Sequence, residues 1–231
     1  MLKNEMVAKN PLRALDQSSD GGLVPGQLGL VAARAGTGKT AFLIQVALDS
    51  LFRGNPVLHL SVGETVSHVQ AWYREMFRDL AEGYDLEKAK EVWEEVELNR
   101  FIMTFRVETF SVAKLEERLT DLVEQDIFQP RVVLVDKLDL SAANVREDLE
   151  ALAAFARAKG LKIWVSARTH RGDGEVASFV DPVKDLFQVA VALDPQPDAT
   201  IALRMLKNPS GNAGTASLTL DPRTLLLHTP A

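Results

Sequence analysis

The sequence contains no cysteine, few aromatic residues (6%) and no long hydrophobic run. The lack of cysteine excludes a disulfide framework, a zinc site built on thiolates and a cysteine nucleophile. It fits a reducing compartment, so we expect a cytoplasmic protein. No apolar run approaches the ~20 residues that a membrane-spanning helix needs. The opening segment also has no continuous apolar stretch of the kind found in a secretory signal, so we expect no membrane association.

Positive charge is also in short supply. Lys and Arg number 26 against 32 Asp and Glu, which gives a formal net charge of −6. Because affinity for a nucleic-acid backbone comes from clustered Lys and Arg, this balance argues against nucleic-acid binding over the whole surface. The length of 231 residues and the hydrophobic fraction of 46% predict a single globular domain. We divide that domain into an N-terminal extension (1–14) and a core (15–231).

Short apolar runs alternate with amphipathic helical patterns along most of the chain, which is typical of an α/β fold with a mostly parallel sheet. The pattern predicts strands at 28–32, 57–61, 101–105, 132–135 and 161–166. It predicts helices at 39–52, 64–80 and 82–97, and further helices that begin after Ser111 and Asn144. Residues 167–184 contain two glycines and a proline and predict a long, mobile loop. Four further strands, at 186–193, 200–206, 216–220 and 225–228, predict an antiparallel C-terminal part.

The most specific motif is a phosphate-binding loop between the first predicted strand and helix. Residues 33–40, Ala-Arg-Ala-Gly-Thr-Gly-Lys-Thr, match the Walker A pattern except that alanine replaces the first glycine. In such a loop, backbone N–H groups at a helix N-terminus hold phosphate oxygens, the lysine reaches the β- and γ-phosphates, and the hydroxyl binds Mg²⁺. We therefore expect Thr40 to bind the metal and Lys39 to act in catalysis. The predicted nucleotide contacts are Ala33, Arg34, Ala35, Gly36, Thr37, Gly38, Lys39, Thr40 and Ala41.

Two carboxylates could complete such a site. The apolar run 132–135 ends in Asp136, and a buried strand that ends in a carboxylate beside the phosphate loop can hold Mg²⁺. Glu64 follows the strand 57–61, where a group that activates water is expected. The alternative for Glu64 is an acid in the first turn of the next helix, favoured by the helix dipole. Local sequence alone leaves both readings open.

These motifs together resemble the RecA-like ATPases, in the branch of the KaiC-like proteins and the core of the DnaB helicase. The resemblance rests on residues 21–28, on the phosphate loop, on Leu60-Ser61-Val62-Gly63-Glu64, on residues 133–136 and on Lys207-Asn208-Pro209-Ser210-Gly211. It implies a three-layer α/β fold with a mostly parallel twisted sheet, helices on both faces and C-terminal antiparallel strands. It also implies ATP and Mg²⁺ as ligands and a homo-oligomeric ring or filament.

The resemblance also suggests roles for single residues. Glu64 is implied to activate water, and Ser166 lies on the strand that senses the γ-phosphate. Lys207 resembles the basic residue that is offered to the nucleotide of a neighbouring subunit. Two departures, Pro209 in place of a second basic residue and Ala167 in place of glutamine, predict slow turnover.

We therefore expect a Mg·ATP-binding ATPase that hydrolyses slowly and couples the nucleotide to conformational switching or to assembly. One alternative is a DNA-dependent motor, for which single-stranded DNA is a possible but not a favoured partner, because the predicted loops lack net positive charge. A second is a nucleotide-binding regulatory protein that does not hydrolyse, with the acidic helix 82–97 as a surface for a protein partner. A third is a GTPase, since Asp136-Lys137-Leu138-Asp139 approximates the guanine-reading motif.

Overall fold

The computed structural model describes residues 2–13, 22–169, 175–208 and 218–229. Within these residues nine strands form one sheet, in the order β3-β2-β4-β5-β1-β6-β7-β8-β9. The strands from β3 to β6 in that order are parallel, and β7, β8 and β9 extend the sheet in antiparallel orientation. The strands are β1 (Leu28–Arg34), β2 (Val57–Val62), β3 (Arg100–Phe105), β4 (Val132–Leu138), β5 (Lys162–Thr169), β6 (Val189–Pro195), β7 (Ile201–Lys207), β8 (Leu218–Leu220) and β9 (Leu227–His228).

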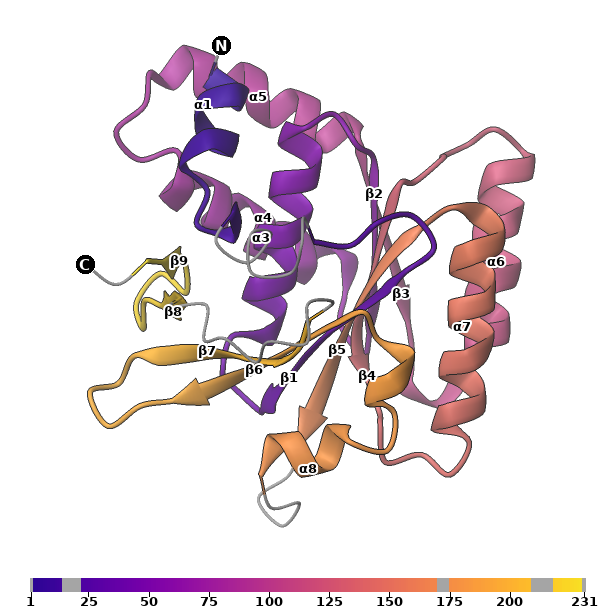
Figure 1. Cartoon of the computed structure of the whole chain (residues 1–231). Coiled ribbons are helices and arrows are strands. Elements are labelled where there is room, and N and C mark those ends of the chain that lie inside the picture. Colours follow the sequence, from indigo (N-terminus) through magenta and orange to yellow (C-terminus); the bar gives the residue numbers. More distant parts are fainter. Residues whose placement is uncertain (1, 14–21, 170–174, 209–217, 230–231) are drawn as a thin grey trace.

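Helices cover both faces of the sheet and give the predicted three-layer α/β fold (Figure 1). One face carries α1 (Leu2–Lys9), α3 (Lys39–Phe52), α4 (Val66–Leu80) and α5 (Leu86–Leu98), and the other carries α6 (Val112–Glu124) and α7 (Val145–Lys159). The shorter helices are η1 (Val107–Thr109), α8 (Val176–Val180) and η2 (Lys184–Leu186). No helix in this described part of the chain is both long and apolar enough to cross a membrane.

The central strands are buried on both faces, which explains why they read as unbroken apolar runs. In β1, Val31 and Ala33 pack on the face of α3, while Leu30 and Ala32 pack on the face of α6 and α7. All four side chains are fully buried. The carboxyl end of β1 is therefore fixed by two apolar layers, and the phosphate loop begins there.

The helix that follows the phosphate loop is anchored to the sheet by aromatic packing. Phe42 of α3 is fully buried and meets the Trp164 ring of β5 edge-on, with ring centroids 5.5 Å apart. Gly29 of β1 leaves room for that indole, because a Cβ on this residue would lie 2.7 Å from the ring. The N-terminus of α3 is thus held at a fixed position over the sheet.

Most of the predicted elements are confirmed, and α3 has the predicted bounds. Two helices begin later than predicted. Thr65 caps α4 by accepting a hydrogen bond from the His68 N–H, and Asp85 caps α5 by accepting from the Lys88 N–H. Each cap fixes where helical backbone can begin, since its side chain satisfies a free N–H of the first turn. Glu64 consequently lies in the turn before α4.

The predicted long loop at 167–184 is wrong where the structure describes it. Strand β5 continues to Thr169, and α8 and η2 follow before β6. The reason is burial: Val176, Val180 and Val183 lie in the apolar core between the sheet and its helices. Residues 170–174 are outside the described part of the chain.

Candidate active site

The phosphate loop joins β1 to α3 in the order that the sequence predicts. Gly36 and Gly38 have φ angles of 75° and 87°, a conformation that favours glycine at both positions. Ala33, where the usual pattern has glycine, lies in β1 and is buried. An alanine is accommodated there because extended backbone suits any L-residue. The loop therefore keeps its glycines where the backbone requires them.

Lys39 points back over this loop. Its ammonium donates hydrogen bonds to the carbonyl oxygens of Ala33 and Arg34, at 3.0 and 2.7 Å. The Thr37 hydroxyl also donates to the Arg34 carbonyl. Burial lowers the pKa of Lys39 to about 8, with Asp136 opposing this shift and the cations Arg168 and Lys137 reinforcing it. A phosphate group nearby would raise this pKa again, because a negative charge favours the ammonium form.

A chain of hydrogen bonds joins the half-buried Thr40 to the buried Asp136 and Ser166. The Thr40 hydroxyl donates to Asp136 Oδ2 at 2.9 Å, and the Ser166 hydroxyl donates to Asp136 Oδ1. Strand β5 separates β1 from β4, so Asp136 does not come from the strand next to the phosphate loop. It nevertheless lies beside Thr40, and the two offer the hard oxygen ligands that Mg²⁺ prefers in nucleotide sites. Their chemistry fits that ion.

Glu64 lies in the turn between β2 and α4. Strand β2 lies next to β4 in the sheet. One carboxylate oxygen, Oε1, accepts from the Lys137 ammonium, and the other, Oε2, lies 2.7 Å from His68 Nδ1. The hydrogen bond from Lys137 is the main cause that lowers the pKa of Glu64, and His68 adds to it. The carboxylate is therefore held on both sides.

A cavity of about 710 Å³ extends from these residues. The phosphate loop and the start of α3 form one end, where Lys39, Thr40 and Asp136 line it. From there it passes the apolar side chains Ile44, Trp72 and Met76, and it is bounded by the turn Arg223-Thr224-Leu225 before β9. It is thus polar at the loop and partly apolar beyond it.

Three basic residues of this cavity, Lys137, Arg168 and Arg223, were not predicted as part of the site. A signal existed for two of them, since Lys137 directly follows Asp136 and Arg168 lies two residues after Ser166. Both positions fall at the carboxyl edge of the sheet. No local sequence pattern predicts Arg223 as a residue of this cavity, because its position depends on how the C-terminal strands pack over the phosphate loop. The packing of β8 against the phosphate loop is close, since a Cβ on Gly38 would lie 3.0 Å from the Leu220 side chain.

Lys207 lies apart from the other predicted residues. It ends β7, and its ammonium donates to the carbonyl oxygens of Lys184 and Asp185 in η2, at 3.0 and 3.1 Å. Burial lowers its pKa. The structure does not bring it to the phosphate loop of its own chain. Pro209, the departure that follows it, lies outside the described residues.

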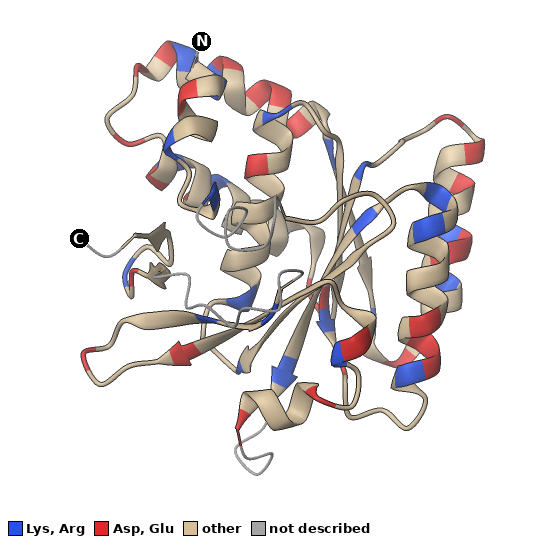
Figure 2. Ribbon diagram, viewed as in Figure 1, with Lys and Arg blue, Asp and Glu red and all other residues tan. Residues whose placement is uncertain are grey.

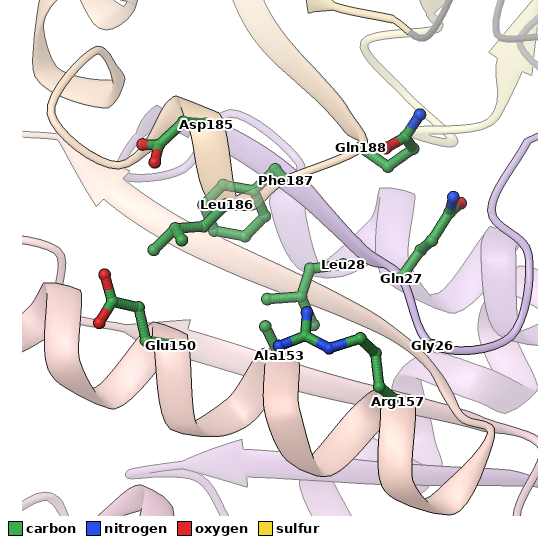
Figure 3. A pocket seen from close by; sticks show the side chains of 10 residues that line it. All are labelled: Gly26, Gln27, Leu28, Glu150, Ala153, Arg157, Asp185, Leu186, Phe187 and Gln188. Carbon is green, nitrogen blue, oxygen red and sulfur yellow. The ribbon is translucent and has the colours of Figure 1, made fainter.

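A second, smaller cavity of about 290 Å³ lies at the opposite edge of the sheet (Figure 3). It is formed by the start of β1, by α7 and by the segment before β6, with Arg157, Glu150 and Asp185 on its walls. In parallel sheets, ligands bind outside the carboxyl ends of the strands. This cavity is at the amino ends and contains no residue of the phosphate loop, so the larger cavity is the candidate active site.

The fold and the phosphate loop define a RecA-like P-loop ATPase. A family model described as ATPase, KaiC, matches residues 9–177, more than half of the chain. The chain belongs to this KaiC-like ATPase family. No curated protein matches the sequence.

Proposed function

We propose that the protein binds Mg·ATP at the phosphate loop and hydrolyses it slowly. The observation that carries this proposal is the convergence of Lys39, Thr40 and Asp136 at one end of the large cavity. Lys39 would bind the β- and γ-phosphates, and Thr40 and Asp136 would hold Mg²⁺. The backbone of residues 33–41 would surround the phosphates, and Ser166 would act through its hydrogen bond to Asp136.

The nucleoside would occupy the apolar part of the same cavity. Trp72 of α4 and Leu225 of the C-terminal turn offer flat or apolar surface to a base, and Arg223 lies nearby. Binding sites for such ligands are largely apolar, with a few polar groups that fix orientation. ATP would thus lie between the phosphate loop, α4 and the turn before β9.

Glu64 would orient or deprotonate the attacking water. Its position after β2, next to the strand of Asp136, supports this role over that of a simple first-turn acid. We further propose that nucleotide state controls assembly of a homo-oligomeric ring or filament. In such an assembly Lys207 would serve a neighbouring subunit, and α5 could receive a protein partner. We propose the cytoplasm as the place of this ATP hydrolysis and assembly.

The placement of Asp136 favours ATP over GTP. If the protein were a GTPase, Asp136-Lys137-Leu138-Asp139 would recognise the guanine base. The Asp136 carboxylate instead accepts a hydrogen bond from Thr40, at the end of the cavity where the phosphates would lie. The charges do not favour DNA either. Figure 2 shows acidic residues along α5 and mixed charges on α6 and α7, whereas a strand of DNA needs a positively charged groove.

The test is the turnover of ATP and GTP by purified protein, with and without single-stranded DNA, at several protein concentrations. We expect slow, Mg²⁺-dependent ATP turnover that does not respond to DNA and whose specific activity rises with protein concentration. Glu64→Gln should retain ATP binding and lose at least ~100-fold in turnover. Glu91→Gln, on the exposed side of α5, is the matched control and should behave like the wild type. Unchanged turnover in Glu64→Gln would contradict the assignment.

A further inference from the structure

Lys137 has an unusual backbone conformation at the carboxyl end of β4. Its φ is 73°, in the left-handed region that residues other than glycine rarely adopt. At this point the register between β4 and β5 shifts, between Val135 and Leu138. The Lys137 N–H donates to Ser166 Oγ at 2.8 Å, and the same hydroxyl donates to Asp136. The Ser166 hydroxyl, itself fixed by Asp136, thus holds the Lys137 backbone in a conformation that costs free energy.

Backbone strain of this kind persists only where surrounding contacts enforce it, and it is frequent at functional sites. Here the strained residue carries a side chain that spans two parts of the site. Its ammonium pairs with Glu64, and the residue lines the large cavity together with Lys39 and Arg168. Lys137 therefore connects the carboxylate that would activate water with the space that would hold the phosphates.

The pairing restrains Glu64. Lys137 and His68 occupy its two carboxylate oxygens, and the lowered pKa that results makes this carboxylate a weaker base. Of the two partners, only Lys137 also lines the large cavity. A ligand in the cavity can therefore compete for Lys137 but not directly for His68.

The cavity offers a strong competitor for that lysine. Lys137 and Arg168 line the cavity with Lys39 and both act electrostatically on it, while Asp136 acts on it in the opposite direction. Such a cluster of cations suits a polyanion. The terminal phosphate of a nucleoside triphosphate carries more charge than a carboxylate and offers three acceptor oxygens.

We propose that Lys137 exchanges its partner, from Glu64 to the terminal phosphate of a bound nucleoside triphosphate, and so releases Glu64 to orient water. The inference rests on the proposed function and adds to it a phosphate-binding residue that also positions the catalytic carboxylate. A nucleoside diphosphate has no third phosphate and leaves Lys137 on Glu64. The carboxylate is thus freed only when the substrate is present.

The test is a double-mutant cycle on nucleotide affinity, with Glu64→Gln, Lys137→Met and the double variant. Calorimetry would compare ADP with a non-hydrolysable ATP analogue, both with Mg²⁺. Met keeps most of the aliphatic stem and meets the same backbone cost at positive φ. Lys159→Met, an exposed lysine of α7, controls for the loss of one charge.

We expect Lys137→Met to lose about tenfold in affinity for the analogue, the size of one charge-assisted hydrogen bond, and to bind ADP like the wild type. Glu64→Gln should bind the analogue more tightly, because Lys137 no longer has to leave a carboxylate. That gain should vanish in the double variant, and Lys137→Arg should keep most of the wild-type preference for the analogue.

Two results would overturn the inference while leaving the proposed function in place. One is an unchanged ratio of analogue to ADP affinity in Lys137→Met, and the other is a gain from Glu64→Gln that persists without Lys137. Failure of the wild-type protein to bind either nucleotide would instead overturn the proposed function, and the inference with it.

Discussion

His59 is a histidine held neutral inside the protein. It lies on β2, fully buried, with its Nδ1 3.0 Å from the hydroxyl of Tyr73 on α4. Burial lowers the pKa of His59 to about 4, against an opposing effect of Asp136 and a small reinforcing effect of Arg100. Arg100 in turn lies 4.4 Å from the centroid of the Tyr73 ring, a cation–π contact. A buried polar pair, His59 and Tyr73, thus joins β2 to α4 within the apolar core.

The low pKa of His59 predicts that stability falls in acid. An unfolded histidine has a pKa near 6.5, so between about pH 6.5 and pH 4 the unfolded chain binds a proton that the folded chain does not. The stabilisation is complete above pH 6.5 and is lost as pH falls towards 4, by up to ~3 kcal/mol. Urea unfolding at several pH values should show a smaller loss in His59→Gln.

His228 on β9 is exposed and provides the control, because His228→Gln removes a histidine but leaves His59 buried and should still lose stability in acid. If His59→Gln lost stability in acid as steeply as the wild type, the neutral state of His59 would not be the cause.

At the scale of residues, the sequence predicts those groups that must stand at a fixed spacing to bind phosphate and Mg²⁺. Lys39, Thr40 and Asp136 meet in the structure because a loop, a helix and a strand end bring them together. Lys137 and His59 were not predicted as functional or buried polar groups. Nothing in the local pattern distinguishes a lysine with left-handed backbone from any other exposed lysine. The partner of a histidine within an apolar strand is defined only once α4 has packed on it.

Among the elements, α1 is the least expected. Its sequence, with mixed charge and few apolar residues, predicts only an N-terminal extension and no helix. In the structure, Leu2 and Met6 are buried in the apolar core shared with α3 and α5. The first helix thus packs behind the helix that carries the phosphate loop.

This packing predicts that a charge at Met6 destabilises the protein. Met6→Asp should lower the free energy of unfolding by roughly 2–4 kcal/mol, because the core must either bury an unpaired carboxylate or release α1. Asn4→Asp introduces the same residue at an exposed position of the same helix and should change stability little. Equal urea midpoints for the two variants would show that α1 contributes no packing energy.

The other elements show what periodicity can and cannot predict. Helix α3 was predicted with its bounds because it begins at a motif and ends before Gly54. By contrast, the pattern predicts a loop at 167–184, since a five-residue helix and a 3₁₀ turn are too short to show a period. Their valines are buried by tertiary contacts that only the finished fold provides.

For the whole molecule, alternating strands and helices predicted a mostly parallel sheet with antiparallel strands at the C-terminus, and both are present. The strand order was not predictable from local pattern. It places β5 between the phosphate-loop strand and the strand of Asp136, and it puts β2, which Glu64 follows, beside the strand of Asp136. The candidate active site therefore depends on topology, since four strands contribute to it from distant parts of the chain.

The central claim is that this site binds Mg·ATP, and the most direct measurement is calorimetric titration of the protein with ATP. We expect one nucleotide per chain and weaker binding when Mg²⁺ is chelated. We also expect a loss of at least about tenfold in affinity in Lys39→Ala but not in Lys159→Ala. Absence of ATP binding by the wild-type protein, or equal affinity in Lys39→Ala, would contradict it.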